Sequence, residues 1–191
     1  MLGDLEVPPN ASGLVVFAHG TGSSRFSPRN RLVAQVLRAD GFATLLLDLL
    51  TESEEQTDLR TREFRFDVGL LADRVLSALD RMREHEAVRG LPVGLFGAST
   101  GAAAALIVAA ARPEVVRAVI SRGGRPDLAG DALHDVAAPT LMIVGGRDPR
   151  ILAANRLASR ELSALHRIEV IPGATHLFEE RGALERVAAL A

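Results

Sequence analysis

The fold is decided by Val93–Ala111, VGLFGASTGAAAALIVAAA. Residues 93–96 predict a buried strand, and the alanine-rich run that follows Gly101 predicts a helix packed closely against it. Between them stands Gly97-Ala98-Ser99-Thr100-Gly101. A Gly-x-Ser-x-Gly sequence between strand and helix is typical of the nucleophile elbow, a sharp turn that lifts a serine hydroxyl above a sheet. The alternative is a tight glycine turn whose serine has no chemical role.

Outward from this stretch, short apolar runs alternate with amphipathic ones. The apolar runs predict strands at 14–18, 43–47, 93–96, 118–120, 140–144 and 168–171. Apolar residues at helical spacing predict helices around 32–37, 71–82, 101–111, 151–165 and 184–188. The polar segment 51–63 is expected to be a surface connection. This alternation predicts an α/β fold: a mostly parallel sheet with helices on both faces, in one domain over residues 1–191.

The missing residue types limit the chemistry. The 191 residues include no Cys, Trp, Tyr or Lys, so all 22 basic residues are Arg. There is consequently no thiolate nucleophile, thiolate zinc site, Schiff-base lysine or P-loop lysine. Arg stays protonated and cannot serve as a base at neutral pH. Acid–base and nucleophilic chemistry must therefore come from Ser, Thr, Asp, Glu and the five His residues.

Charge and hydropathy exclude other classes of partner. The net charge of −2 provides no basic field for nucleic acid or an anionic membrane. The longest apolar run, Ala102–Ala111, is about half of a membrane span. The N-terminal MLGDLEVPPN carries acids and prolines where a signal peptide would be basic and then apolar. We expect a cytoplasmic protein with a small-molecule substrate; the sequence does not predict its oligomeric state.

A serine nucleophile needs a base and an orienting acid, and both are available at predicted strand ends. His176 follows the last strand in Gly173-Ala174-Thr175-His176, although a surface loop histidine would look the same. Asp148 follows the 140–144 strand, and its alternative role is to cap the helix that begins with Pro149. Asp127 is the second candidate for the acid. Ser99, Asp148 and His176 stand in the chain order expected for α/β-hydrolases.

An oxyanion site needs two backbone donors. The amide of Thr100, directly after the serine, is the first candidate. Thr21, in the loop His19-Gly20-Thr21-Gly22 after the first strand, is the second, with Gly22 as its alternative. His19 is expected to organise this loop rather than to catalyse. A glycine-rich loop can also cradle phosphate, but this one lacks the G-x-G-x-x-G pattern and a lysine.

Four loop arginines are expected near this rim. They are Arg25, Arg29, Arg122 and Arg125. Guanidinium groups can clamp a carboxylate or a phosphate through two hydrogen bonds, which would favour an anionic substrate. The alternative is an ordinary solvated surface. The acids in 52–58 are expected to be solvated or to pair with these arginines.

These motifs together resemble the dienelactone hydrolase-like branch of the α/β-hydrolase superfamily. The matching pieces are FAHGTGSS, GLFGASTGAA, LMIVGGRDP and IPGATHLFEE. The resemblance implies a minimal α/β-hydrolase fold, hydrolysis of esters or related acyl bonds by a Ser99–His176–Asp148 triad, and no cofactor or metal. Dienelactone hydrolases proper carry a Cys nucleophile, which this chain lacks, so their lactone substrate is not implied. The interval 118–140 is too short for a large lid domain.

The prediction is therefore a serine hydrolase that cleaves small esters through an acyl-enzyme. The same triad could instead transfer acyl groups, form peracids or cleave C–C bonds. A third class is a binding protein on a hydrolase fold, since fold alone does not establish function.

Overall fold

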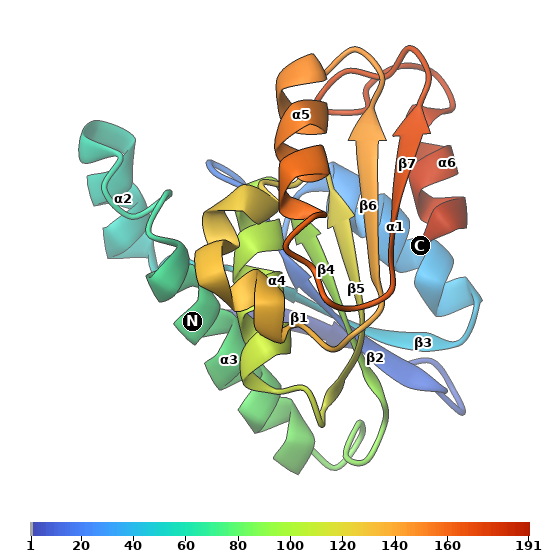
Figure 1. Cartoon of the computed structure of the whole chain (residues 1–191). Coiled ribbons are helices and arrows are strands. Elements are labelled where there is room, and N and C mark those ends of the chain that lie inside the picture. The colour runs from blue at the N-terminus through green and yellow to red at the C-terminus, as the bar shows by residue number, and fades with distance from the viewer. Residues whose placement is uncertain (1) are drawn as a thin grey trace.

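A seven-stranded sheet forms the centre of the computed structural model, which describes residues 2–191 (Figure 1). The strand order is β1-β3-β2-β4-β5-β6-β7; β1 pairs antiparallel with β3, and all other pairs are parallel. The strands are β1 (Gly3–Glu6), β2 (Gly13–Ala18), β3 (Phe42–Leu47), β4 (Val93–Ala98), β5 (Val116–Arg122), β6 (Thr140–Gly145) and β7 (His166–Ile171). The predicted mostly parallel sheet is confirmed.

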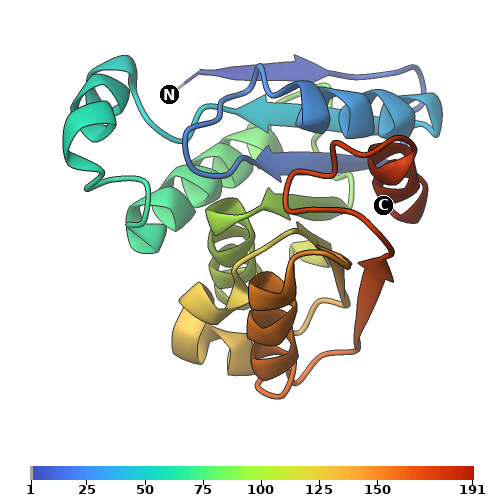
Figure 2. The same cartoon turned by 90° about the horizontal axis from the view of Figure 1, so that it is seen from above.

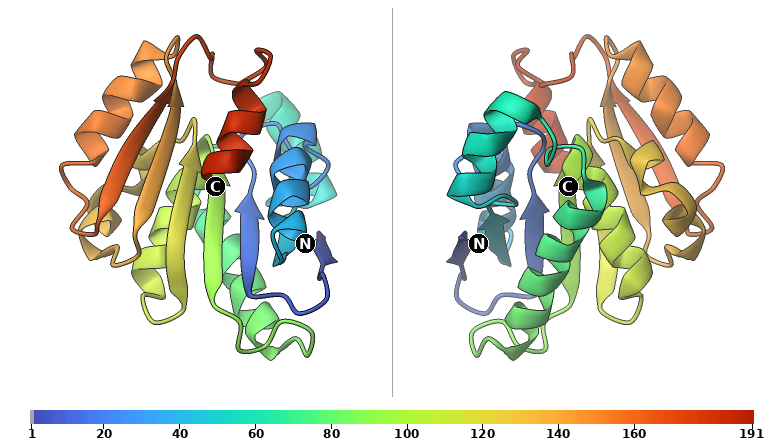
Figure 3. Two further views of the ribbon diagram at one scale, coloured as in Figure 1. Left: turned by 90° about the vertical axis from the view of Figure 1, so that its right-hand side faces the viewer. Right: turned by 90° about the vertical axis from the view of Figure 1, so that its left-hand side faces the viewer.

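Helices cover both faces of the sheet (Figures 2 and 3). The helices are α1 (Pro28–Ala39), α2 (Glu52–Thr61), α3 (Val68–Glu84), α4 (Thr100–Ala111), α5 (Pro149–Ala158) and α6 (Ala183–Leu190), with a 3-10 segment η1 (Pro126–Asp135). α1 and α6 lie side by side on one face, in the left panel of Figure 3. α3, α4, η1 and α5 cover the other face, and α2 stands out from the body of the molecule at the left of Figure 1.

Side chains that alternate along the strands pack into two apolar layers, one on each face of the sheet. From β2, Val16 packs toward α3 and α4, while the neighbouring Phe17 packs toward α1 and α6. Phe17 stacks on Phe96 of β4 with ring centroids 4.8 Å apart. Because both faces of β2 and β4 are buried, these two strands carry only apolar residues and glycine, which is the pattern that identified them in the sequence.

The turn from β4 to α4 depends on two glycines. A Cβ on Gly97 would collide with the backbone of Gly101 and Ala102. A Cβ on Gly101 would collide with the carbonyl oxygens of Ala18 and His19, at the end of β2. The first turn of α4 therefore lies directly on the end of the neighbouring strand, as the glycine spacing predicted.

Three parts of the chain differ from the sequence predictions. Segment 51–63, predicted to be a plain connection, contains α2, which begins at a capping box formed by Thr51 and Glu54. The helix predicted through 165 ends at Ala158, and Leu165 is 80% exposed. The edge strand β1 was not predicted because its four residues are too short to show an alternating pattern. As expected, only the short η1 separates β5 from β6, so no large lid is inserted there.

In the described part of the chain, residues 2–191, no helix combines the length and the apolar character needed to cross a bilayer.

We predict that Gly101→Ala lowers the free energy of unfolding by about 1–3 kcal/mol, because the added methyl group must displace the end of β2. Helix propensity alone predicts the opposite, a gain of about 0.5–1 kcal/mol. Gly69→Ala in α3 is the matched control: its Cβ would meet only the Asp67 side chain, at 3.4 Å. Urea unfolding of both variants measures the difference. Equal stabilisation by both substitutions would show that the close approach has no energetic consequence.

Candidate active site

Ser99 occupies the turn between β4 and α4 in a backbone conformation that residues other than glycine rarely adopt. Its backbone has φ 50° and ψ −121°, and the residue is partly exposed. Its N–H donates to the carbonyl of Arg122 at 3.3 Å, and its own carbonyl accepts from the N–H of Arg125 at 3.0 Å. The loop after β5 thus holds the strained residue in place, as expected for a functional turn.

His176 and Asp148 are brought together by the loops after β7 and β6. His176 Nδ1 lies 2.7 Å from Asp148 Oδ2, and the aspartate side chain is only 13% exposed. An ionised carboxylate only accepts hydrogen bonds, so the proton of a neutral imidazole is on Nδ1. Nε2 is then the free, basic nitrogen, which is the tautomer that a serine nucleophile requires.

Backbone contacts fix the relative position of these two loops. The N–H of Gly146 donates to Ile171 at 2.8 Å, and the N–H of Arg147 donates to Ala174 at 2.9 Å. A Cβ on Gly145 would collide with the carbonyls of the His176 loop. The aspartate–histidine pair therefore rests on a rigid contact between two loops.

The sequence left two roles open for Asp148, and its two carboxylate oxygens make the contact that each role requires. Oδ2 faces His176, while Oδ1 accepts from the N–H of Ile151 at 3.4 Å and caps α5. The second candidate acid, Asp127, is held by Arg125, whose Nε and Nη2 donate to its two oxygens at 2.8 and 2.7 Å. Of these two acids, Asp148 is the one that contacts His176.

Ser99 and His176 lie at the same edge of the sheet. Gly123, next to the Arg122 carbonyl that holds Ser99, also packs against the His176 ring: a Cβ on Gly123 would lie 3.6 Å from its Cε1. Among residues 2–191, no hydrogen bond joins the serine hydroxyl to the imidazole. Catalytic hydrogen bonds are often long without substrate and tighten in the complex, so this geometry is compatible with a nucleophile and its base.

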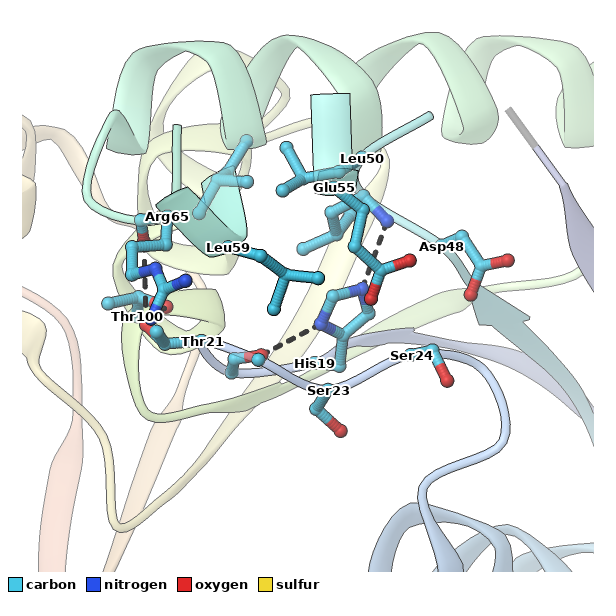
Figure 4. A pocket seen from close by; sticks show the side chains of 14 residues that line it. His19, Thr21, Ser23, Ser24, Asp48, Leu50, Glu55, Leu59, Arg65 and Thr100 are labelled. Carbon is cyan, nitrogen blue, oxygen red and sulfur yellow. Dashed lines mark hydrogen bonds between the residues drawn. The ribbon is translucent and has the colours of Figure 1, made fainter. Parts of the chain in front are cut away.

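The expected oxyanion loop touches the elbow. Thr21 Oγ1 lies 3.2 Å from Thr100 Oγ1, so the side chains of the two candidate donor residues are hydrogen-bonded to each other (Figure 4). The Thr100 amide is in the first turn of α4, where backbone N–H groups have no partner within the helix. Gly22, the alternative donor, has φ 65° and faces open space.

His19 organises this loop, as the sequence suggested. Its Nδ1 is 2.8 Å from the Gly20 carbonyl, and its Nε2 accepts from the N–H of Leu49 at 3.0 Å. These partners fix the neutral tautomer with the proton on Nδ1. Burial lowers the pKa of His19, which likewise favours the neutral ring. The imidazole thus ties the end of β2 to the end of β3.

A pocket opens beside Thr100 and the His19 loop (Figure 4). Its apolar wall consists of Leu49, Leu50, Leu59 and Leu71. Glu55 and Leu59 reach it from α2, and Arg65 lies beside Thr100, where its carbonyl accepts from Thr21 Oγ1 at 3.4 Å. The Arg65 side chain is itself fixed by buried Asp58, whose Oδ2 accepts from Nε at 2.6 Å. These α2 residues were missed in the sequence; the Thr51–Glu54 capping box was the signal that could have revealed their helix.

The candidate substrate-binding arginines have different surroundings. Arg25 is held by Asp48 and by Asp4, and Arg125 by Asp127. Their charges are thus matched by carboxylates of this chain. Arg122 is buried and has no carboxylate partner among residues 2–191.

No group of three or more metal-ligating side chains that could hold an ion occurs within residues 2–191.

Comparison with known proteins identifies the family of this chain. The dienelactone hydrolase family model matches residues 3–190. A dienelactone hydrolase structure from Anabaena variabilis is 58% identical, with a TM-score of 0.96 over 98% of this chain and 87% of that one. Est1E from Butyrivibrio proteoclasticus shares the fold at 17% identity, with a TM-score of 0.81 over 98% of this chain and 90% of its own.

Two Mycobacterium tuberculosis proteins, from strains H37Rv and CDC 1551, are also similar. They are provisionally named phosphoribosyl transferases Rv0571c and MT0597. Each is 58% identical to this chain over 190 residues. The match covers 99% of this chain but only 42% of theirs, so the chain spans less than half the length of these relatives.

We predict that stability falls as the pH drops below about 6.5, the ordinary pKa of histidine, because the unfolded state then binds a proton that folded His19 resists. The slope from this group is at most about 1.4 kcal/mol per pH unit. His19→Asn should remove this component and cost about 1–3 kcal/mol at pH 7, because Leu49 loses its acceptor. Urea unfolding between pH 5 and 7 measures both effects.

Val33→Ala, a core variant that leaves His19 intact, is the control for general destabilisation and should keep the wild-type slope. An unchanged slope in His19→Asn would contradict the assignment of this pH dependence to His19.

Proposed function

Because the chain belongs to the dienelactone hydrolase family, we propose that it is a serine hydrolase that cleaves small esters through an acyl-enzyme. The observation that carries this proposal is the strained Ser99 at the edge of the sheet that also carries the His176–Asp148 pair. A serine hydroxyl is a weak nucleophile unless a base lies beside it, and this fold supplies the base in the required tautomer.

In the first half of the reaction, Ser99 Oγ attacks the ester carbonyl carbon while His176 Nε2 takes the hydroxyl proton. Asp148 stabilises the resulting imidazolium and keeps its orientation. The carbonyl oxygen becomes an oxyanion, which the amides of Thr100 and Thr21 stabilise. The intermediate then collapses: the C–O bond to the alcohol breaks, and His176 returns its proton to the leaving oxygen.

In the second half, water attacks the acyl-enzyme and gives its proton to His176. Collapse of the second intermediate releases the carboxylic acid and restores the Ser99 hydroxyl. No cofactor takes part in either half of this scheme. The Thr21–Thr100 contact supports Thr21, rather than Gly22, as the second oxyanion donor, because it holds the loop against the elbow.

The pocket beside Thr100 supports a small apolar group as part of the substrate. Four leucines line it, together with polar groups of the His19 loop, Asp48, Glu55, Arg65 and Thr100. The names of the M. tuberculosis relatives do not carry over to this chain, which covers only 42% of their length. The same triad could instead carry out acyl transfer, peracid formation or C–C cleavage. Product analysis with competing nucleophiles distinguishes these reactions from hydrolysis.

We predict that Ser99→Ala abolishes turnover of p-nitrophenyl acetate, with kcat falling by about 10⁴-fold or more, since the covalent route is lost. The fold and the unfolding temperature should change little, because the side chain is partly exposed and caps no helix. Ser23→Ala, on the rim of the neighbouring pocket, is the matched control. Wild-type turnover by Ser99→Ala would rule out the proposed nucleophile.

Asp148 allows its two roles to be separated. Asn caps helices about as well as Asp, so Asp148→Asn should leave stability nearly unchanged. It should nevertheless reduce kcat by about 10⁴-fold, because an amide no longer selects the required histidine tautomer. Asp148→Ala should show the same catalytic loss and also lower the free energy of unfolding by about 1 kcal/mol.

Steady-state kinetics and urea unfolding of both variants test this separation. Full activity in Asp148→Asn would contradict the role of Asp148 as the orienting acid.

A further inference from the structure

Arg122 is a buried cation without a matching anion. It is 7% exposed, and the only hydrogen bond of its side chain within residues 2–191 is from Nη2 to Asn30 Oδ1 at 3.3 Å. Its Nε is enclosed and has no partner in the described chain. The ring of Phe178 lies 5.9 Å away and offers only a weak cation–π contact. Buried charges in proteins are normally paired, so this guanidinium lacks its expected partner.

A second arginine increases the local positive charge. Arg29 lies near enough to act on Arg122: burial and the charge of Arg29 lower the pKa of Arg122 to about 10. The Arg29 Nε is also enclosed and unpartnered in the described residues. Within residues 2–191 its one carboxylate partner is Glu179, 3.6 Å from Nη1 and itself 65% exposed. Arg122 thus bonds Asn30, the residue that follows Arg29, and Glu179 is the one carboxylate paired with either guanidinium in the described residues.

Helix α1 adds a third source of positive potential. Arg29 and Asn30 are in its first turn, which contains no acidic residue. The helix dipole favours a negative charge here, although Pro28 has no N–H and the N–H of Asn30 already donates to Ser27 Oγ at 3.3 Å. Arg122 reaches the same end of α1 from β5, through its bond to buried Asn30.

We propose that Arg122, Arg29 and the first turn of α1 form a binding site for an oxyanion, that is, a phosphate or carboxylate group. Each guanidinium presents enclosed N–H groups that such oxygens can accept from, and the anion would separate the two like charges. This site is distinct from the pocket beside Thr100, none of whose lining residues belongs to it.

The position of the site connects it with the catalytic loops. Arg122 is the residue whose carbonyl holds Ser99, and Phe178 follows His176 by two positions. Glu179, on the same loop, pairs with Arg29 and would compete with a bound anion. The anion either stands free in this site or is a charged end of the substrate.

Calorimetric titration with sodium phosphate, at an ionic strength held constant with sodium chloride, tests the site. Wild type should bind phosphate saturably. Arg122→Met and Arg29→Met should each weaken binding by 10-fold or more. Glu179→Gln should strengthen it several-fold, because the competing carboxylate is removed. Arg112→Met is the control: Arg112 pairs with Asp80 in a separate contact, and its loss should leave phosphate affinity unchanged.

Equal phosphate affinity in all of these proteins, or no saturable binding in wild type and Glu179→Gln, overturns the proposal. Arg29→Met and Glu179→Gln change partly exposed side chains, so the test stands even if Arg122→Met does not fold. The titration requires no turnover and is therefore independent of the proposed hydrolase activity.

Kinetics with two esters, one that carries a carboxylate and one that is neutral, distinguish the two sources of the anion. If the anion is part of the substrate, phosphate should raise KM for p-nitrophenyl hemisuccinate but not for p-nitrophenyl butyrate, and Arg29→Met should raise it in the same selective way. If the anion stands free, phosphate should leave the preference between the two esters unchanged.

Discussion

The active-site edge depends on the contact between the first turn of α4 and the end of β2. Gly101 lies against the carbonyls of Ala18 and His19 with no room for a methyl group. This contact fixes two things at once: the strained backbone of Ser99, two residues earlier, and the start of the His19–Gly22 loop beside it. The proposed nucleophile and the proposed oxyanion donors are therefore positioned by the same approach of backbone to backbone.

The second half of the site follows the same principle with different elements. Asp148 and His176 come from neighbouring parallel strands, and backbone hydrogen bonds between their loops set the 2.7 Å contact before any substrate is present. The carboxylate also caps α5, so one side chain both caps a helix and contacts the proposed base. Preorganisation of this kind is what lets a fold activate a weak nucleophile without a cofactor.

The sequence was informative where chemistry and packing require particular residues. Buried parallel strands must be apolar throughout, and the elbow must carry glycines, so residues 93–111 predicted both the fold and Ser99. It was uninformative where several residues suit the same role: α2 is polar on most sides and contributes Leu59 to the pocket only through the tertiary fold. Leu165 matched a helical spacing but stands beyond the end of α5, exposed. The surroundings of the arginines depend on which carboxylates lie within reach, which no local pattern encodes.

The central claim is that Ser99 is activated by His176. Labelling with a fluorophosphonate probe, followed by mass spectrometry of the modified peptide, tests it most directly, since such probes react only with an activated serine. The account predicts one adduct per chain, on Ser99, and its loss in His176→Gln. The absence of an adduct on Ser99, or equal rates of labelling in the two proteins, would contradict it.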